Sequence, residues 1–115
     1  MSSFLRRSVK STQRKMRQLE LIIDGTGTAA LSGPASLQAT LTDNGVGDFT
    51  ITFAEAFAQL PVCIPVCLTA DCVVDTMVPA VGSVQVTLVD ATDGTTAKDG
   101  DFHILIIGSE VTDQF

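Results

Sequence analysis

The sequence contains no tryptophan and no tyrosine, and its only aromatic side chains besides one histidine are six phenylalanines. Single-stranded nucleic acids and sugar rings are bound largely by stacking on aromatic side chains, so such a platform is not expected here. The formal net charge is −6 at pH 7, and an acidic surface repels phosphate. These features argue against a folded body that binds nucleic acid.

Long apolar runs are also missing, since no stretch reaches the ~18 residues needed to cross a bilayer. We therefore expect no membrane partner. The N-terminus carries positive charge without an apolar region behind it, which argues against a secretory signal peptide. Its arginines and serines, with no acidic residue among them, are also typical of a mitochondrial presequence, and that interpretation stays open.

Positive charge is gathered almost wholly at one end of the chain. Six of the seven Lys and Arg residues fall within residues 1–17, and all thirteen Asp and Glu residues follow them. Residues 18–115 thus carry thirteen acids and one lysine, a charge of −12. This asymmetry divides the chain into a basic N-terminal anchoring arm, residues 1–19, and a body, residues 20–115.

The arm is expected to be a short helix or a segment that becomes ordered on a partner. A tail that only improves solubility is the alternative. The arm residues expected to contact a partner are Phe4, Leu5, Arg6, Arg7, Val9, Lys10, Arg14, Lys15 and Arg17.

Cysteine is scarce and odd in number, with Cys63, Cys67 and Cys72. Cys63 and Cys67 are four residues apart in a predicted strand, which separates them by about 13 Å. A disulfide needs Cα atoms within ~7 Å, so these two cannot bond unless the chain turns between them. We expect the cysteines to be small buried hydrophobic residues in a reducing compartment.

Alternation of apolar and polar residues marks short strands in the body. Residues 37–42, 48–53 and 83–90 alternate cleanly, and the Asn-Gly pair within residues 43–48 predicts a hairpin turn. Six or seven strands at short spacing predict an all-β fold, a small antiparallel β-sandwich or barrel.

Residues 62–69 form a further predicted strand, with Val62, Ile64, Val66 and Leu68 on one face. Cys63, Pro65 and Cys67 occupy the other face. Pro65 cannot donate a ladder hydrogen bond, so this strand is expected at a sheet edge or with a bulge.

The last strand, residues 102–109, is apolar on both faces. Phe102, Ile104 and Ile106 share one face, while Leu105 and Ile107 lie on the other. One face of a strand in a small antiparallel sandwich normally meets water. The strand is therefore either central in the fold or covered by a neighbouring subunit, and we expect Leu105 and Ile107 to lie at an oligomer contact.

Residues for catalysis or metal binding are few. His103 is the only conventional general base, and no GxSxG nucleophile motif or phosphate-binding lysine motif is present. A lone histidine also leaves tetrahedral zinc short of its usual ligands. We expect a structural histidine, no cofactor and no enzymatic activity.

Carboxylates do gather in residues 90–101, where they are weak candidates for a calcium site. The spacing lacks the glycine and the closing glutamate of a calcium-binding loop, so a hairpin loop with solvated acids is the preferred interpretation. The carboxylates concerned are Asp90, Asp93, Asp99 and Asp101.

The segment DNGVGDFTITFAEAFAQLPVCIPV, followed by DFHILIIGS, resembles patterns found in small virion proteins of tailed bacteriophages. The similarity covers residues 43–109 and is to capsid decoration (cement) proteins and to fibre tips. It implies a non-enzymatic protein, a homotrimer on the outer capsid surface that binds the major capsid protein through its N-terminal arms and stabilises the capsid. A tail-fibre tip, or a tail adaptor that binds a receptor or another virion protein, is the alternative. The absence of Trp and Tyr weakens the fibre-tip interpretation.

Overall fold

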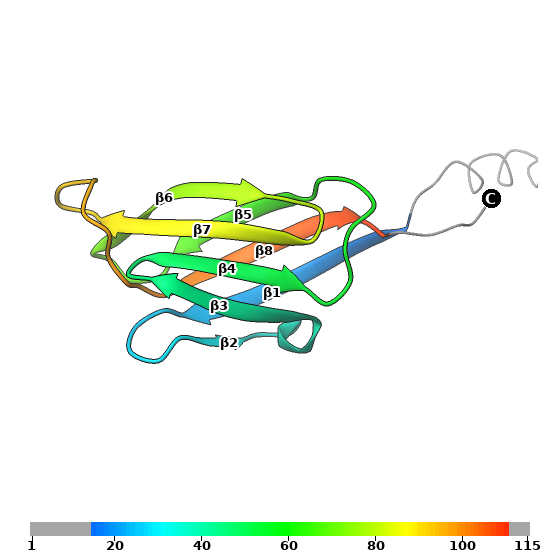
Figure 1. The fold of residues 1–115 in the computed structure, drawn as a ribbon, viewed down its shortest axis with the longest axis horizontal. Coiled ribbons are helices and arrows are strands. Elements are labelled where there is room, and N and C mark those ends of the chain that lie inside the picture. The colour runs from blue at the N-terminus through cyan, green and yellow to red at the C-terminus, as the bar shows by residue number, and fades with distance from the viewer. Residues whose placement is uncertain (1–14, 111–115) are drawn as a thin grey trace, which may run out of the picture.

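The computed structural model describes residues 15–110, which form eight β-strands and one short 3₁₀-helix (Figure 1). The strands are β1 (Met16–Asp24), β2 (Ala30–Ser32), β3 (Ala39–Gly45), β4 (Asp48–Phe53), β5 (Val62–Cys67), β6 (Cys72–Pro79), β7 (Ser83–Asp90) and β8 (Phe102–Ser109). The 3₁₀-helix η1 (Ser36–Gln38) precedes β3. Within these residues, no helix is long and apolar enough to span a membrane.

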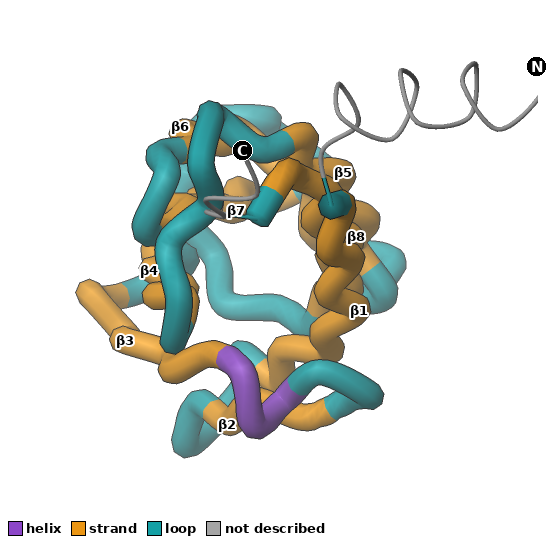
Figure 2. Tube along the Cα trace, turned by 90° about the vertical axis from the view of Figure 1, so that its right-hand side faces the viewer, coloured by secondary structure: helices purple, strands orange, loops and turns teal. Residues whose placement is uncertain are grey.

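The strands make two four-stranded sheets in which every neighbouring pair is antiparallel. Sheet A has the order β2-β1-β8-β5, and sheet B has the order β3-β4-β7-β6. Seen along the strands, β1, β5 and β8 lie opposite β3 and β4 (Figure 2). This architecture confirms the predicted all-β sandwich, with eight strands in the described residues instead of six or seven.

The core fills the space between the sheets, because alternate residues of each central strand point inward. Each such side chain contributes about 1.5–3 kcal/mol by leaving water. Phe49 of β4 and Phe102 of β8 bring their rings within 5.8 Å across this core. The largest fully buried side chains are Leu19, Leu21, Ile23, Phe49, Ile51, Phe57, Val84, Val86, Leu88, Phe102, Ile104 and Ile106.

Strand β1 begins four residues inside the range assigned to the arm. Residues 16–19 are extended and pair with β8, with Leu19 buried opposite Ile106, so the helical interpretation is wrong for this part. Leu19, Leu21 and Ile23 occupy alternate positions, with Gln18 and Glu20 between and before them but the apolar Ile22 between Leu21 and Ile23.

The predicted strand 37–42 starts later than expected. Residues 36–38 form η1, and Leu37 is almost fully exposed instead of sharing a buried face with Ala39. The hairpin at residues 43–48 is present but tighter, because β3 continues to Gly45 and β4 starts at Asp48. Strands β2 and β6 are not anticipated by the sequence reasoning at all.

The prediction for Pro65 is confirmed, since β5 is an edge strand of sheet A. Pro65 faces Ile104 of β8 in the register. On an edge strand the position of the missing proline N–H can face solvent, so every carbonyl of the neighbouring strand keeps its hydrogen-bond donor.

Candidate functional site

The outer face of sheet B is largely polar. Threonines from β3 and β4 face solvent there, and Asn44 Nδ2 donates a hydrogen bond of 2.8 Å to Thr50 Oγ1. Gln85 Nε2 donates to Asp48 Oδ1 at 2.9 Å. Val73 and Val78 on edge strand β6 are exceptions. Sheet B thus presents the hydrated outer face that is usual for an antiparallel sandwich.

The outer face of sheet A is different, because aliphatic side chains occupy most of it. Val62, Ile64 and Val66 of β5 are 61%, 48% and 54% exposed, respectively. Leu105 and Ile107 of β8 are half-buried beside them. Contiguous exposed apolar surface of this kind marks an interaction site in soluble proteins.

The strand register explains how these side chains meet. Val62 pairs with Ile107 and Ile64 pairs with Leu105, so the outward side chains of β5 and β8 stand side by side. Directly opposite residues in antiparallel strands place their Cβ atoms within about 5.5 Å. We call this surface the sheet A apolar face, and define it as Ile22, Val62, Ile64, Val66, Leu105 and Ile107.

A shallow groove of about 530 Å³ lies on this face. Ile22, Ile64 and Leu105 line it together with Pro34, which follows β2. Its ionisable lining groups are Glu20 and His103. The groove is therefore mainly a hydrophobic surface with little charge.

The alternation expected in residues 62–69 is present, and the structure decides which side meets the core. Cys63 points inward and is buried, whereas Val62 and Ile64 point outward. Both sides are apolar in the sequence, so local pattern alone offers no means of choosing between them. This orientation places Val62 and Ile64 on the sheet A apolar face.

The two predicted contact residues, Leu105 and Ile107, lie on that face. Their neighbours Phe102, Ile104 and Ile106 are buried in the core of the same chain. Strand β8 is a central strand of sheet A. This agrees with the first of the two explanations for its two apolar faces, a central position in the fold. A partner that covers the outer face remains a prediction.

His103 is exposed on the same surface, between β1 and β5. Its register partners are Ile22 on one side and Val66 on the other. Neither hydrocarbon side chain can act as a nucleophile or exchange a proton, so the two residues directly opposite His103 provide no second catalytic group.

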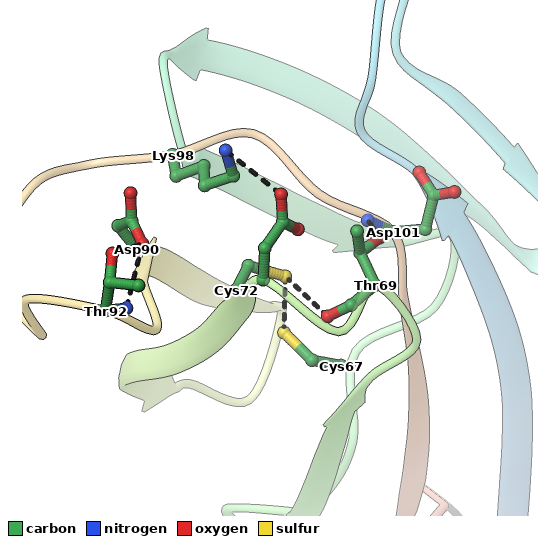
Figure 3. A network of polar contacts seen from close by, with 8 residues as sticks. Cys67, Thr69, Cys72, Asp90, Thr92, Lys98 and Asp101 are labelled. Carbon is green, nitrogen blue, oxygen red and sulfur yellow. Dashed lines mark hydrogen bonds and ion pairs between the residues drawn. The ribbon is translucent and has the colours of Figure 1, made fainter.

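The four candidate calcium ligands instead bind backbone and side-chain donors at separate places. Asp90 Oδ1 accepts a 2.9 Å hydrogen bond from Thr92 N (Figure 3), and Asp93 Oδ1 accepts one of 2.9 Å from Thr95 N. Hydrogen bonds from Thr92 lower the pKa of Asp90. The amide of Thr95, followed by the hydroxyl and amide of Thr96, lowers the pKa of Asp93 to about 2.

Asp99 and Asp101 join distant loops. Asp99 Oδ1 accepts a 2.7 Å hydrogen bond from Gly47 N, and Asp101 Oδ1 accepts one of 3.1 Å from Gly25 N. Among residues 15–110, no three His, Cys, Asp or Glu side chains gather closely enough to hold a metal ion. The structure therefore does not bring the four carboxylates together.

Only two of the proposed arm residues, Lys15 and Arg17, lie in the described part of the chain. Arg17 belongs to β1, with its side chain only 13% exposed, so the structure places it in the body and not in a free arm. The remaining ones lie outside the described residues: Phe4, Leu5, Arg6, Arg7, Val9, Lys10 and Arg14.

Comparisons with protein-family models, with curated proteins and with solved structures found no match for this chain. The class of the protein is therefore defined by its own architecture, an antiparallel β-sandwich with one hydrated face and one apolar face.

Proposed function

We propose that this chain is a non-enzymatic assembly protein whose copies associate through the sheet A apolar face. The observation that carries the proposal is the exposure of Val62, Ile64 and Val66 beside half-buried Leu105 and Ile107. Covering such a surface releases about 25 cal/mol for each Å² of apolar area buried. The hydrated face of sheet B offers no comparable gain.

A second copy of the same chain is the occupant that the charges favour. Residues 18–115 carry thirteen acids against one lysine, so two copies repel each other over most of their surface. The groove on sheet A contains a single carboxylate, Glu20. This charge-poor surface is where two copies can approach with least repulsion.

The basic N-terminus supplies a second, separate contact. Arg6, Arg7, Lys10, Arg14 and Lys15 precede β1, and Met16 pairs with Ser109 at one end of the sandwich. Strand β1 therefore begins at that end of the body. We propose that the preceding cations bind an acidic partner surface while the sandwich stays clear of it.

The similarity of residues 43–109 to phage virion proteins suggests what that partner is. In our proposal the protein is a capsid decoration (cement) protein, a homotrimer on the outer capsid surface whose N-terminal residues bind the major capsid protein. This assignment combines the sequence resemblance with an apolar face and a charged tail. It predicts a stabilised capsid and no catalytic turnover.

Sedimentation of variants tests the self-association. Ile64→Asp and Val66→Asp each place a carboxylate on the proposed interface without disturbing the core, since both side chains are about half exposed. We expect the wild type to sediment as a trimer and both variants as monomers. Thr52→Asp also places an aspartate in a strand, on the outer face of sheet B, and should remain trimeric.

Milder substitutions test the same interface with less risk of unfolding the protein. Ile64→Thr and Val66→Thr retain β-branched side chains and should weaken the trimer while leaving the circular dichroism spectrum unchanged. A wild-type protein that stays monomeric at high concentration refutes self-association through this face. Retained trimers in both aspartate variants would place the contact elsewhere, and binding of a different virion protein to the face would favour the tail adaptor.

A further inference from the structure

Two of the three cysteines lie against each other where the chain passes from one sheet to the other. Cys67 is the last residue of β5 in sheet A, and Cys72 is the first residue of β6 in sheet B. Their Sγ atoms are 2.9 Å apart as free thiols (Figure 3). The spacing of the cysteines in the sequence does not reveal this pair, because the turn between β5 and β6 brings the two residues together.

We propose that Cys67 and Cys72 are an oxidisable pair that forms a disulfide bond joining sheet A to sheet B. The S–S bond is ~2.05 Å long, so the sulfur atoms need approach by only about 0.9 Å. Cys63 is four residues earlier on the same strand, about 13 Å away, which leaves it as the unpaired thiol. The inference does not depend on the proposed function.

The backbone around the pair already holds the two sulfur atoms together. Leu68 N donates to the carbonyl of Asp101 at 2.8 Å, and Asp101 N donates to Thr69 Oγ1 at 3.0 Å. Cys72 N donates to the carbonyl of Thr69 at 3.3 Å. These contacts fix residues 68–71, so bond formation requires no rearrangement of either sheet.

Two further contacts close the site from the side of residues 98–101. Lys98 Nζ lies 3.2 Å from Asp71 Oδ2, the residue immediately before Cys72. Gly100 packs so closely that a Cβ at this position would overlap the Cys72 sulfur. The loop that contains Gly100 therefore packs directly against the Cys72 sulfur, and a larger residue at position 100 would overlap it.

The reaction that we propose is exchange with a small disulfide such as oxidised glutathione. Cys67 is the more exposed thiol, since Cys72 is only 3% exposed. Deprotonated Cys67 attacks one sulfur of the reagent, which forms a mixed disulfide and expels one thiolate. Deprotonated Cys72 then attacks Cys67 Sγ and expels the second thiolate. Both expelled thiolates take up the protons lost by the cysteines, so one reagent disulfide becomes two thiols.

The exchange should be slow at neutral pH. Burial, the hydrogen bond with Cys72 and the negative charge of Asp71 raise the pKa of Cys67 to about 12. Burial raises the pKa of Cys63 to about 11. Since thiolates are the attacking species, the oxidation is best run at mildly alkaline pH over hours.

The test is intact mass spectrometry after incubation of the reduced protein with oxidised glutathione. We expect the mass to fall by about 2 Da, for the two hydrogen atoms lost, and the count of alkylatable thiols to fall from three to one. Cys63→Ser should behave like the wild type. Cys67→Ser and Cys72→Ser should form no intramolecular bond.

Peptide mapping identifies the bonded residues. No Lys or Arg lies between Arg17 and Lys98, so trypsin leaves all three cysteines in one peptide. Cleavage before aspartate divides the chain at Asp71 and separates Cys67 from Cys72. The fragments 48–70 and 71–74 should stay joined until a reductant is added, in Cys63→Ser as in the wild type.

The oxidised protein should also melt several degrees higher than the reduced protein, because the cross-link restricts the unfolded chain. Denaturation and refolding in the same redox buffer removes any barrier caused by slow access to the folded protein. The proposal is wrong if three thiols survive both treatments. A bond that includes Cys63, or one that joins two molecules, would overturn it equally.

Discussion

The guanidinium carbon of Arg17 lies 4.2 Å from the centre of the Phe57 ring. Arg17 Nη1 is also 3.1 Å from Glu55 Oε1, and Nη2 donates to the carbonyl of the same residue. Phe57 is buried and packs edge-on against Phe53 at 5.2 Å. The start of β1 is thereby attached to the loop between β4 and β5. Arg17, which the sequence analysis expected to bind a partner, therefore contacts residues of its own fold.

Replacing Arg17 with alanine should destabilise the protein by about 1–3 kcal/mol. The loss comprises a partly desolvated cation–π contact and a hydrogen bond to the Glu55 carbonyl. Glu55→Gln should cost less than about 1 kcal/mol, because the Glu55 side chain is 79% exposed and an exposed ion pair contributes little. Urea denaturation of the two variants measures both values. An Arg17→Ala protein as stable as the wild type would show that the contact with Phe57 contributes nothing.

Gly47 and Gly27 provide a matched pair that separates backbone strain from close contact. Both have positive φ, 66° and 65°. A Cβ at Gly47 would lie 2.6 Å from the Leu88 carbonyl oxygen and 2.9 Å from Lys98 N, whereas nothing lies within 4 Å at Gly27. Gly27→Ala should therefore cost about 1–2 kcal/mol for the left-handed conformation alone.

Gly47→Ala should cost more than Gly27→Ala, because the methyl group also displaces the backbone on two sides. It should in addition weaken the hydrogen bond from Gly47 N to Asp99. Thermal denaturation of the two variants, side by side, measures the difference. Equal melting temperatures would contradict the close approach at Gly47.

The depressed pKa of Asp93 predicts a specific sensitivity to acid. Its folded pKa of about 2 lies below the ordinary value of 3.8, so the ionised carboxylate stabilises the fold above about pH 4. That contribution is lost progressively as the pH falls from about 4 to about 2. Asp93→Asn should be less stable than the wild type at pH 7, and the two should converge towards pH 2. Urea midpoints over this range test the prediction, and a constant difference would contradict it.

Charge removal from the N-terminal segment should weaken attachment but not folding. We expect replacement of Arg6, Arg7, Lys10, Arg14 and Lys15 by glutamine to lower affinity for an acidic capsid surface, most strongly at low salt. Exposed charges are screened beyond ~10 Å at 0.1 M salt, so the wild type should itself bind less well as salt increases. Co-sedimentation with capsids at several salt concentrations measures this. Binding that is unaffected by salt in both proteins would instead assign attachment to Phe4, Leu5 and Val9.

Local alternation in the sequence is sufficient to locate β4 and β7 and their inward-facing residues. If such a strand shifted by one residue along its neighbour, all of its apolar side chains would turn from the core to solvent. Only one register therefore buries them. The edge position of β5 follows from Pro65 by the same local reasoning. For these elements the physical cause of the structure is contained in a few consecutive residues.

Tertiary structure decides what no local pattern contains. Both faces of β5 are apolar, and only the position of β8 beside it determines that Cys63 enters the core while Ile64 faces solvent. Cys67 and Cys72 meet because the chain crosses between sheets, which depends on strand order and not on spacing. Arg17 becomes structural because Phe57, forty residues later, lies beneath it. Strand pairing and sheet packing join residues distant in sequence, and the balance of burial over the whole sandwich determines which of them come together.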